Sequence, residues 1–216
     1  MDTGASVDSA LIHAAGQKHL EIVRCLLEYV QDKKSVLNAY YRDVLLNVTS
    51  TLCSAVFRGH LNIVRYLVEA GADPLLRCSY NGVSQLAIHR TFEARHAHGA
   101  LDIIRYLISV DRRQLEARTS EGKTCLHLAA EANDAECADW LLSEGADHTA
   151  VTSWDETPWQ RACKKNSLAV MGVFLKKEIG SLQARHNQRQ TGYNSPYVLT
   201  WFVPDYTPFY WGGGVS

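Results

Sequence analysis

The sequence predicts an all-α fold, a row of short helical hairpins stacked side by side. The segment 122–147, GKTCLHLAAEANDAECADWLLSEGAD, holds two short amphipathic patterns, each with its apolar residues on one helix face. A hairpin this small cannot bury its apolar face alone, so it needs similar neighbours. Such neighbours are present, because the pattern around Leu126 in the first helix recurs four more times along the chain. The residues at the position of Leu126, called anchors below, are Leu11, Leu52, Leu86, Leu126 and Trp159.

Two of the anchor spacings are close to about 33 residues and two are about seven residues longer. The pattern resembles the ankyrin repeat. Its first-helix motif, TPLHLAA, matches TCLHLAA at Thr124–Ala130, and its second half matches GHLNIVRYLVEAGAD at Gly59–Asp73. The resemblance covers about 170 of the 216 residues.

The resemblance implies an ankyrin-type solenoid of about five repeats over residues 1–180. The repeats are expected near residues 8–38, 48–78, 81–117, 121–150 and 154–180. Residues 181–216 are expected to form a partial sixth repeat and an irregular, aromatic-rich C-terminal cap or tail.

Local signals agree with this architecture. Pro158 suits the first position of a helix, and Gly71 and Gly145 suit the left-handed conformation that ends the second helices. A Ser or Thr that can accept hydrogen bonds from free backbone N–H groups is expected to open each first helix. These caps are Ser9, Ser50, Ser84, Thr124 and Thr157.

Composition excludes several classes of protein. The net charge of −1 predicts no bulk attraction to nucleic acid or anionic membranes. The N-terminal residues lack the apolar core of a signal peptide, and no apolar run approaches the roughly 20 residues of a membrane span. The cysteines form no CxxC pair, which predicts reduced packing residues in an intracellular protein, cytoplasmic or nuclear. They are Cys25, Cys53, Cys78, Cys125, Cys137 and Cys163.

Two internal segments depart from the repeat. Residues 31–47 are longer than a usual connection and too apolar for a flexible linker, which favours a lengthened finger or an extra helical turn packed on the stack over a partner-contacting loop. The second departure inserts about six residues around 92–98 in the third repeat. Its His89, Glu93, His96 and His98 offer metal-ligand chemistry without a fixed ligand spacing. A first helix extended by one turn, with solvated histidines, is the favoured interpretation, and no metal or cofactor is expected.

The C-terminal segment carries eight aromatic residues between Tyr193 and Trp211. Gly192–Leu199 is similar to the start of a sixth repeat, but Pro204 and Pro208 prevent a second helix there. A cap over the fifth repeat is favoured, because terminal repeats must hide an apolar face. A partner-docking tail, or a cut through a larger protein, is the alternative.

The resemblance places a protein-binding concave face on the hairpin tips and on the exposed side of the inner helices. Phe57, Tyr80 and Trp154 are the strongest candidates, since aromatic anchors dominate interface energetics; packing on the next repeat is the alternative for each. Lys164 and Lys165 are assigned to a solvated face, and Trp140 and Trp159 to packing. The full candidate set is Phe57, Arg58, Tyr80, Asn81, Ser120, Glu121, Lys123, Glu131, Ser153, Trp154 and Glu156.

Catalytic motifs are not found in the sequence. There is no GxSxG elbow, phosphate-binding glycine loop or HExxH motif, so the chain is not expected to be an enzyme. The family pattern assigns His60 and His127 structural roles, with the His127 ring bridging backbone groups between repeats; His19 takes the place of His60 in its own repeat.

These observations predict a non-enzymatic scaffold or adaptor that binds a protein partner, without nucleic acid or membrane, as a monomer or a component of a complex. A targeting or substrate-recruiting part of a larger enzyme or ubiquitin-ligase complex is the alternative. A metal-dependent enzyme centred on the third-repeat histidines is a third hypothesis.

Overall fold

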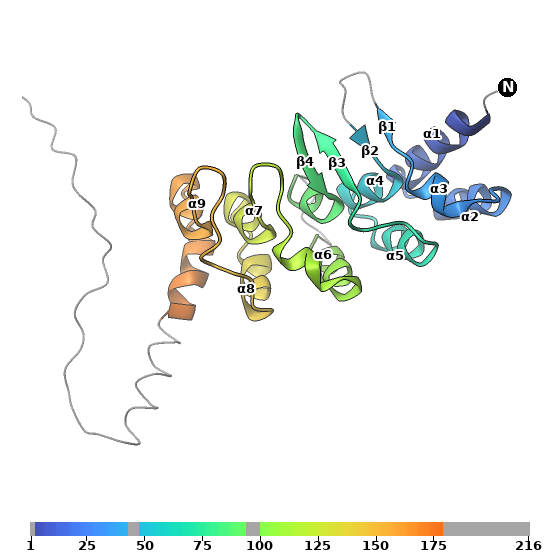
Figure 1. Cartoon of the computed structure of the whole chain (residues 1–216). Helices are drawn as coiled ribbons and strands as arrows, with labels where there is room; N and C mark the ends of the chain where they lie inside the picture. The colour runs from blue at the N-terminus through green and yellow to red at the C-terminus, as the bar shows by residue number, and fades with distance from the viewer. Residues whose placement is uncertain (1–2, 43–47, 94–99, 179–216) are drawn as a thin grey trace, which may run out of the picture. The chain divides into compact units, whose positions relative to one another are not determined.

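A computed structural model describes residues 3–42, 48–93 and 100–178 (Figure 1). The chain divides into two units, Met1–Lys177 and Glu178–Ser216, and nearly all of the second lies outside the described residues. The predicted C-terminal cap, residues 181–216, is therefore not described.

The described residues form five consecutive helix pairs, which confirms the predicted helical-hairpin solenoid. Two further short helices, α3 (Lys33–Leu37) and η2 (Arg112–Glu116), follow the first and third pairs. The pairs are α1 (Thr3–Gly16) with α2 (Leu20–Tyr29), α4 (Thr51–Phe57) with α5 (Leu61–Glu69), η1 (Ala87–Phe92) with α6 (Ala100–Val110), α7 (Cys125–Ala132) with α8 (Ala135–Ser143), and α9 (Pro158–Lys165) with the helical residues 168–178.

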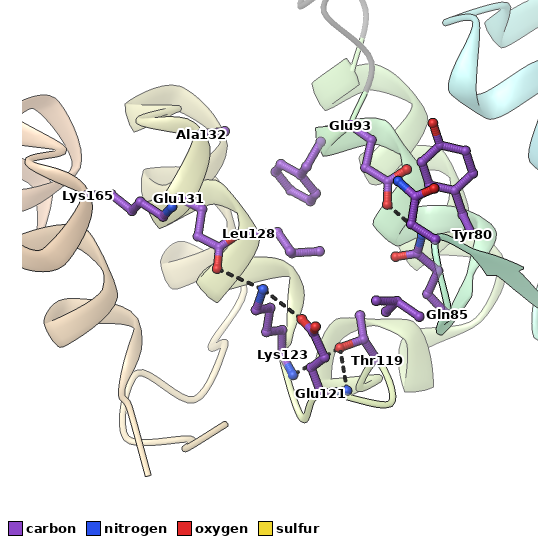
Figure 2. Close-up of a pocket in the computed structure, with 13 residues that line it drawn as sticks. Tyr80, Gln85, Glu93, Thr119, Glu121, Lys123, Leu128, Glu131, Ala132 and Lys165 are labelled. Carbon is purple, nitrogen blue, oxygen red and sulfur yellow. Dashed lines mark hydrogen bonds and ion pairs between the residues drawn. The ribbon is translucent and has the colours of Figure 1, made fainter. Parts of the chain in front are cut away.

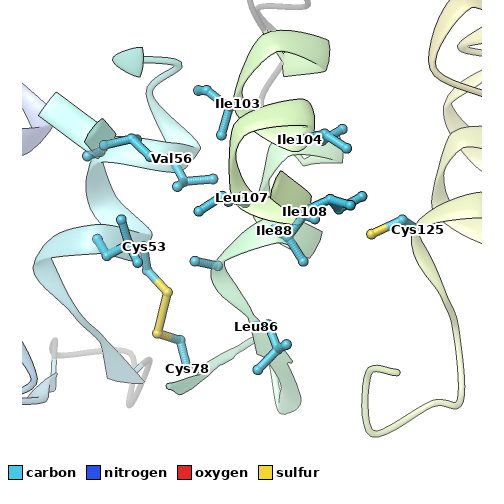
Figure 3. Close-up of a cluster of buried hydrophobic side chains, with 14 of the residues drawn as sticks. Cys53, Val56, Cys78, Leu86, Ile88, Ile103, Ile104, Leu107, Ile108 and Cys125 are labelled. Carbon is cyan, nitrogen blue, oxygen red and sulfur yellow. A yellow bond between two sulfur atoms is a disulfide. The ribbon is translucent and has the colours of Figure 1, made fainter. Parts of the chain in front are cut away.

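The first elements of the pairs pack against one another in chain order, from α1 through α4, η1 and α7 to α9. Their apolar side chains form one continuous core with those of the second helices. Around the third pair this core contains the buried Ile88, Ile103, Ile104 and Leu107 (Figure 3). Burial of each such side chain contributes about 1.5–3 kcal/mol, so each pair depends on its neighbours for stability.

Four short strands, which the sequence analysis did not predict, form an antiparallel sheet in the order β1-β2-β3-β4. Strands β1 (Tyr41–Arg42) and β2 (Val48–Thr49) precede α4, and β3 (Arg77–Tyr80) and β4 (Val83–Leu86) precede η1. Asn81 and Gly82 join β3 to β4 with φ angles of 48° and 79°. An Asn-Gly pair with positive φ at both residues is the favoured two-residue hairpin turn. The tip of the third repeat is therefore a β-hairpin.

This hairpin moves the register of the third repeat. Because β4 extends to Leu86, the helical turn begins two residues later than expected, and Leu86 lies at its N-cap. The side chain in the position of Leu52 and Leu126 is Ile88, so the assignment of Leu86 as the anchor was wrong. The match between His89 and His127 was the sequence signal that could have given the correct register.

Helix caps agree with the predictions in three of five repeats. Ser50, Thr124 and Thr157 are the N-caps of α4, α7 and α9. Ser9 lies inside α1, which begins at Thr3, and Ser84 lies in β4, so these two predictions were wrong. Ser9 is not a cap because α1 begins six residues before it, and Ser84 is not a cap because β4 continues to Leu86.

The helix-ending and helix-starting residues are confirmed. Gly71 and Gly145 follow the C-caps of α5 and α8 with φ angles of 107° and 87°. Pro158 is the first residue of α9, where no helical N–H bond is lost. These positions need no contact with a distant residue, which is why the sequence alone predicts them.

The two internal departures have different outcomes. In residues 31–47, α3 supplies the expected extra helical turn and buries Leu37 completely, while residues 43–47 are not described. In the third repeat, η1 is a short 3₁₀ helix that ends at Phe92, so the expected extension of an α-helix by one turn was wrong as far as the described residues reach. His96 and His98 fall within 94–99, outside those residues.

A disulfide joins Cys53 on α4 to Cys78 on β3, with 7.2 Å between the Cα atoms (Figure 3). The prediction that all six cysteines are reduced was therefore wrong. The pair forms because β3 runs beside the first turn of α4, and the sequence pattern did not predict that strand. The cysteines consequently give no argument about the compartment of the protein.

The second helices are linked by arginine side chains that lie over aromatic rings of the next repeat. Each of these rings belongs to a half-buried Tyr or Trp. One of them is Trp140, which was predicted to pack within the stack. The distances from guanidinium carbon to ring centroid are 5.4 Å for Arg24–Tyr66, 5.1 Å for Arg65–Tyr106 and 5.6 Å for Arg105–Trp140. Trp159, also assigned to packing, is half-buried and meets the Phe174 ring edge-on at 5.9 Å.

Candidate protein-binding surface

A pocket of about 500 Å³ lies between the tips and first elements of the third and fourth repeats, and is called the tip pocket below (Figure 2). Five of the eleven candidate residues line it, namely Tyr80, Asn81, Glu121, Lys123 and Glu131. The other lining residues lie outside the candidate set; they are Val83, Gln85, Phe92, Glu93, Thr119, Leu128, Ala132 and Lys165. The family pattern places Val83 at an outward tip position and Ala132 and Lys165 at exposed inner-helix positions, and Glu93 was considered only as a metal ligand.

The candidates outside the tip pocket fall in two places. Phe57 and Arg58 end α4, on the side of the pocket nearer the second repeat, and the Arg58 guanidinium lies 5.7 Å from the centre of the Phe57 ring. Ser120, Ser153, Trp154 and Glu156 belong to the fourth and fifth tips.

Arg90, at the edge of the pocket, is a buried cation held between two aromatic candidates. Its side chain is 9 % exposed, and its guanidinium carbon lies 4.0 Å from the ring centroid of Tyr80 and 4.5 Å from that of Phe57. Glu93 forms an ion pair with it, and Gln85 donates a 2.6 Å hydrogen bond to the other Glu93 oxygen. Burial lowers the pKa of Arg90, while the Glu93 carboxylate opposes that effect.

Tyr80 and Phe57 therefore each have a ring face occupied within the chain. The contact of Phe57 is with the next repeat, as in the packing alternative, whereas that of Tyr80 is with Arg90 of its own repeat. Both side chains are half-buried. Arg90 escaped the sequence analysis because a charged residue in a first helix is usually assigned to solvent. The Asn81-Gly82 pair was a local signal for the hairpin that carries Tyr80, but not for the direction of its side chain.

Trp154, at the fifth tip, has the opposite character. It is 55 % exposed, and its ring has the Lys123 ammonium at 5.7 Å and the Arg161 guanidinium at 5.9 Å from the centroid. Trp154 is thus an exposed aromatic ring above a charged surface, which is the arrangement expected of an interface anchor.

An ion-pair network runs beneath Trp154 and links the fourth and fifth repeats. Lys123 contacts Glu121 at 2.8 Å and Glu131 at 3.0 Å, and Glu131 also pairs with Arg161. Arg161 contacts Glu156 at 2.6 Å. Lys164 completes the network by pairing with Glu156, and hydrogen bonds from Lys164 and Arg161 lower the pKa of that carboxyl group.

Backbone hydrogen bonds join successive tips. The Ser120 N–H donates to the Ser84 carbonyl at 2.8 Å, and the Ser153 N–H donates to the Glu121 carbonyl at 3.0 Å. Within the fourth tip, the buried Thr119 hydroxyl accepts from the backbone N–H groups of Glu121 and Lys123, each at 3.2 Å. The tips therefore form a preformed surface, which reduces the entropy lost when a partner binds.

His127, His89 and His60 use their ring nitrogens in structural hydrogen bonds, that of His60 being to the Gly16 carbonyl at 3.2 Å. Nδ1 of His127 accepts from the Thr124 N–H at 3.2 Å, and its Nε2 donates to the Glu156 carbonyl of the next repeat at 3.0 Å. His89 makes the same two bonds within and between its repeats. His60 and His19 occupy equivalent places at the starts of α5 and α2. The structural roles predicted for His60 and His127 are confirmed.

The metal hypothesis gains no support from the part of the chain that is described. Both ring nitrogens of His89 are engaged, and Glu93 is held by Arg90 and Gln85. Within the described ranges, no group of three or more His, Cys, Asp or Glu residues is placed to hold a metal ion. Those same ranges contain no helix that combines the length and apolar character of a membrane span.

Comparison with known families identifies the class. A profile described as "Ankyrin repeats (3 copies)" matches residues 2–78 and 93–152, more than half of the chain. The chain therefore belongs to the ankyrin-repeat family, as its sequence resemblance predicted. Ankyrin repeats generally mediate protein–protein interactions and are typically non-catalytic.

Several individual proteins are similar to this chain. Human B-cell lymphoma 3 protein is 31 % identical over 168 residues, which is 76 % of this chain and 34 % of that protein. Its mouse homologue is 33 % identical over 135 residues, 62 % of this chain and 29 % of that protein. Alpha-latroinsectotoxin-Lt1a of Latrodectus tredecimguttatus is 30 % identical over 140 residues, 65 % of this chain and 9 % of the toxin. The chain thus spans 34 % or less of the length of these relatives.

Proposed function

We propose that this chain is a non-enzymatic interaction module that holds a protein partner on the end of α4 in its second repeat and on the tips and first elements of its third, fourth and fifth repeats. The resemblance assigns this side of the stack to the concave face. The proposed contact set keeps the candidate residues and adds Phe92, Leu128 and Lys165, which line the tip pocket.

One observation carries the proposal. Trp154 exposes more than half of its surface on a tip that is hydrogen-bonded to its neighbour, beside the tip pocket. A large aromatic side chain that is exposed to solvent on a rigid tip favours a binding role. A partner that buries it gains apolar contact, and little conformational entropy is lost because the tip is already ordered. Family membership supports the same class of function.

Affinity purification with mass spectrometry tests the proposal. The intact chain is compared with Trp154→Ala and with the matched control Asp139→Ala, an exposed position on α8 among the second helices. Proteins that the intact chain and the control retain, and that Trp154→Ala loses, support the proposal. Retention of every captured protein by Trp154→Ala would show that the binding surface lies elsewhere.

Folding must be unchanged for this comparison to be informative. Because Trp154 is largely exposed and its two cation contacts are at the long end of the range, we expect Trp154→Ala to lower the free energy of unfolding by only about 1 kcal/mol or less. Helical circular dichroism should stay at the value of the unmodified chain.

A further inference from the structure

We infer that the tip pocket binds a short segment of the partner in which an apolar side chain stands next to a carboxylate. This inference rests on the proposed function and names the chemistry that the surface recognises. It follows from the apolar lining of the pocket and from the pairing of the charges around it.

The apolar lining comes from three different elements. Val83 lies on β4, Phe92 ends η1, and Leu128 lies on α7, and all three side chains are half-buried. Leu128 lies between the Tyr80–Gln85 side and the Lys123–Glu131 side (Figure 2). The volume of about 500 Å³ is within the usual range for a ligand pocket and accommodates one apolar side chain with part of its backbone.

The carboxylates that line the pocket already have cationic partners. Glu93 pairs with Arg90, Glu121 with Lys123 at 2.8 Å, and Glu131 with Lys123 at 3.0 Å. An incoming basic side chain would have to compete with these existing pairs. The pocket therefore offers little to a lysine or arginine of the partner.

Lys165 is the lining cation that is available. Among the described residues it forms no ion pair, and its side chain is exposed at the end of α9. A carboxylate of the partner can pair with this ammonium group without breaking a contact. Charge complementarity thus selects an acidic residue beside the apolar anchor.

Selection from an unbiased displayed peptide library against the full chain tests this inference. We expect enrichment of peptides with an apolar residue next to Asp or Glu. Fluorescence anisotropy then measures the affinity of one enriched peptide for the chain and for two pocket variants. Ala132→Trp fills the pocket from an exposed position at the end of α7, and Lys165→Glu reverses the available charge.

Each pocket variant should weaken peptide binding by about tenfold or more, which is the effect of losing one good contact. The matched controls Ala10→Trp and Lys176→Glu change exposed helical positions outside the pocket and should alter affinity less than about twofold. A second selection on Lys165→Glu should replace the acidic residue with Lys or Arg. Circular dichroism of the variants checks that they fold.

Three outcomes would overturn the inference: no enriched peptide, an enriched motif without a carboxylate, or unchanged affinity in either Ala132→Trp or Lys165→Glu. These outcomes are separable from failure of the proposed function. If Trp154→Ala loses captured proteins while Ala132→Trp retains them, the partner binds outside the pocket, and the interaction module stands while the pocket inference falls. If neither variant loses any captured protein, the proposed function falls as well.

Discussion

The guanidinium of Arg90 lies over the ring of Tyr80, with its central carbon 4.0 Å from the ring centroid. The Phe57 ring lies 4.5 Å from the same carbon, and Glu93 neutralises the charge. This one cation therefore joins η1 to α4 of the preceding repeat and to the β3–β4 hairpin. It holds the wall of the tip pocket by contacts from three elements.

Replacement of Arg90 by Ala should lower the free energy of unfolding by about 3 kcal/mol, because it leaves the Glu93 carboxylate without its partner and removes the stacking between two rings. Urea denaturation followed by circular dichroism measures the change. Arg90→Lys keeps the charge but not the planar group, so its loss should be intermediate. A loss below about 1 kcal/mol for Arg90→Ala would mean that the cluster does not join the elements.

The helix pairs could be predicted from the sequence because their signals are local. The apolar pattern around Leu126 and the glycine at position 145 each specify one hairpin without knowledge of its neighbours. The strand pairs were missed because their residues were assigned to repeat tips, although Asn81-Gly82 is a turn signal. That omission shifted the register of the third repeat and hid the pairing of Cys78.

The candidate surface was predictable in part. Trp154 was selected because aromatic anchors dominate interface energetics and a ring at a tip would otherwise expose apolar surface, and it is exposed. Tyr80 was selected on the same ground, but its ring contacts Arg90 of η1. The repeat pattern does not indicate which tip side chains pack back against the first element of their own repeat. Phe92 and Leu128 were not selected as candidates because only the space between two repeats shows that they line one pocket.

Acidification should destabilise the fold through His89. Burial lowers the pKa of His89 from an ordinary 6.5 to about 4. The unfolded chain binds this proton below pH 6.5 and the folded chain does not until about pH 4. The stability that neutral His89 contributes to the folded state is therefore fully present above pH 6.5 and is lost as the pH falls toward 4. The expected loss from this residue is about 2 kcal/mol between pH 7 and pH 5.

Urea denaturation at pH 7 and pH 5 measures this loss. His89→Gln should show a smaller dependence on pH, since the titrating ring is absent. His13→Gln, a change at an exposed histidine on α1, should keep the dependence of the unmodified chain. Equal slopes for all three proteins would remove His89 as the cause. Burial also lowers the pKa of His127, so some dependence should remain in His89→Gln.

Reduction of the Cys53–Cys78 disulfide should lower the free energy of unfolding by about 3 kcal/mol, because the bond closes a loop with a sequence separation of 25 residues. Denaturation with and without a phosphine reductant measures the change. Four free cysteines lie in the described part of the chain, so alkylation under denaturing, non-reducing conditions should label four of the six cysteines. Labelling of all six would contradict the disulfide, and Cys25→Ser should leave the effect of the reductant unchanged.

The stacking of Arg65 on Tyr106 should couple the second and third repeats. The guanidinium carbon lies 5.1 Å from the ring centroid, and the arginine is exposed, so the interaction energy is expected to be about 0.5–1 kcal/mol. A double-mutant cycle with Arg65→Ala and Tyr106→Leu separates this term from the lost packing of each side chain. Arg65→Ala with Trp140→Leu is the matched control, because Trp140 contacts Arg105 of the next repeat instead. The prediction fails if the coupling energy in the first cycle is near zero, or if the two cycles give equal coupling energies. Either result would show that the Arg65–Tyr106 contact does not link the second and third repeats.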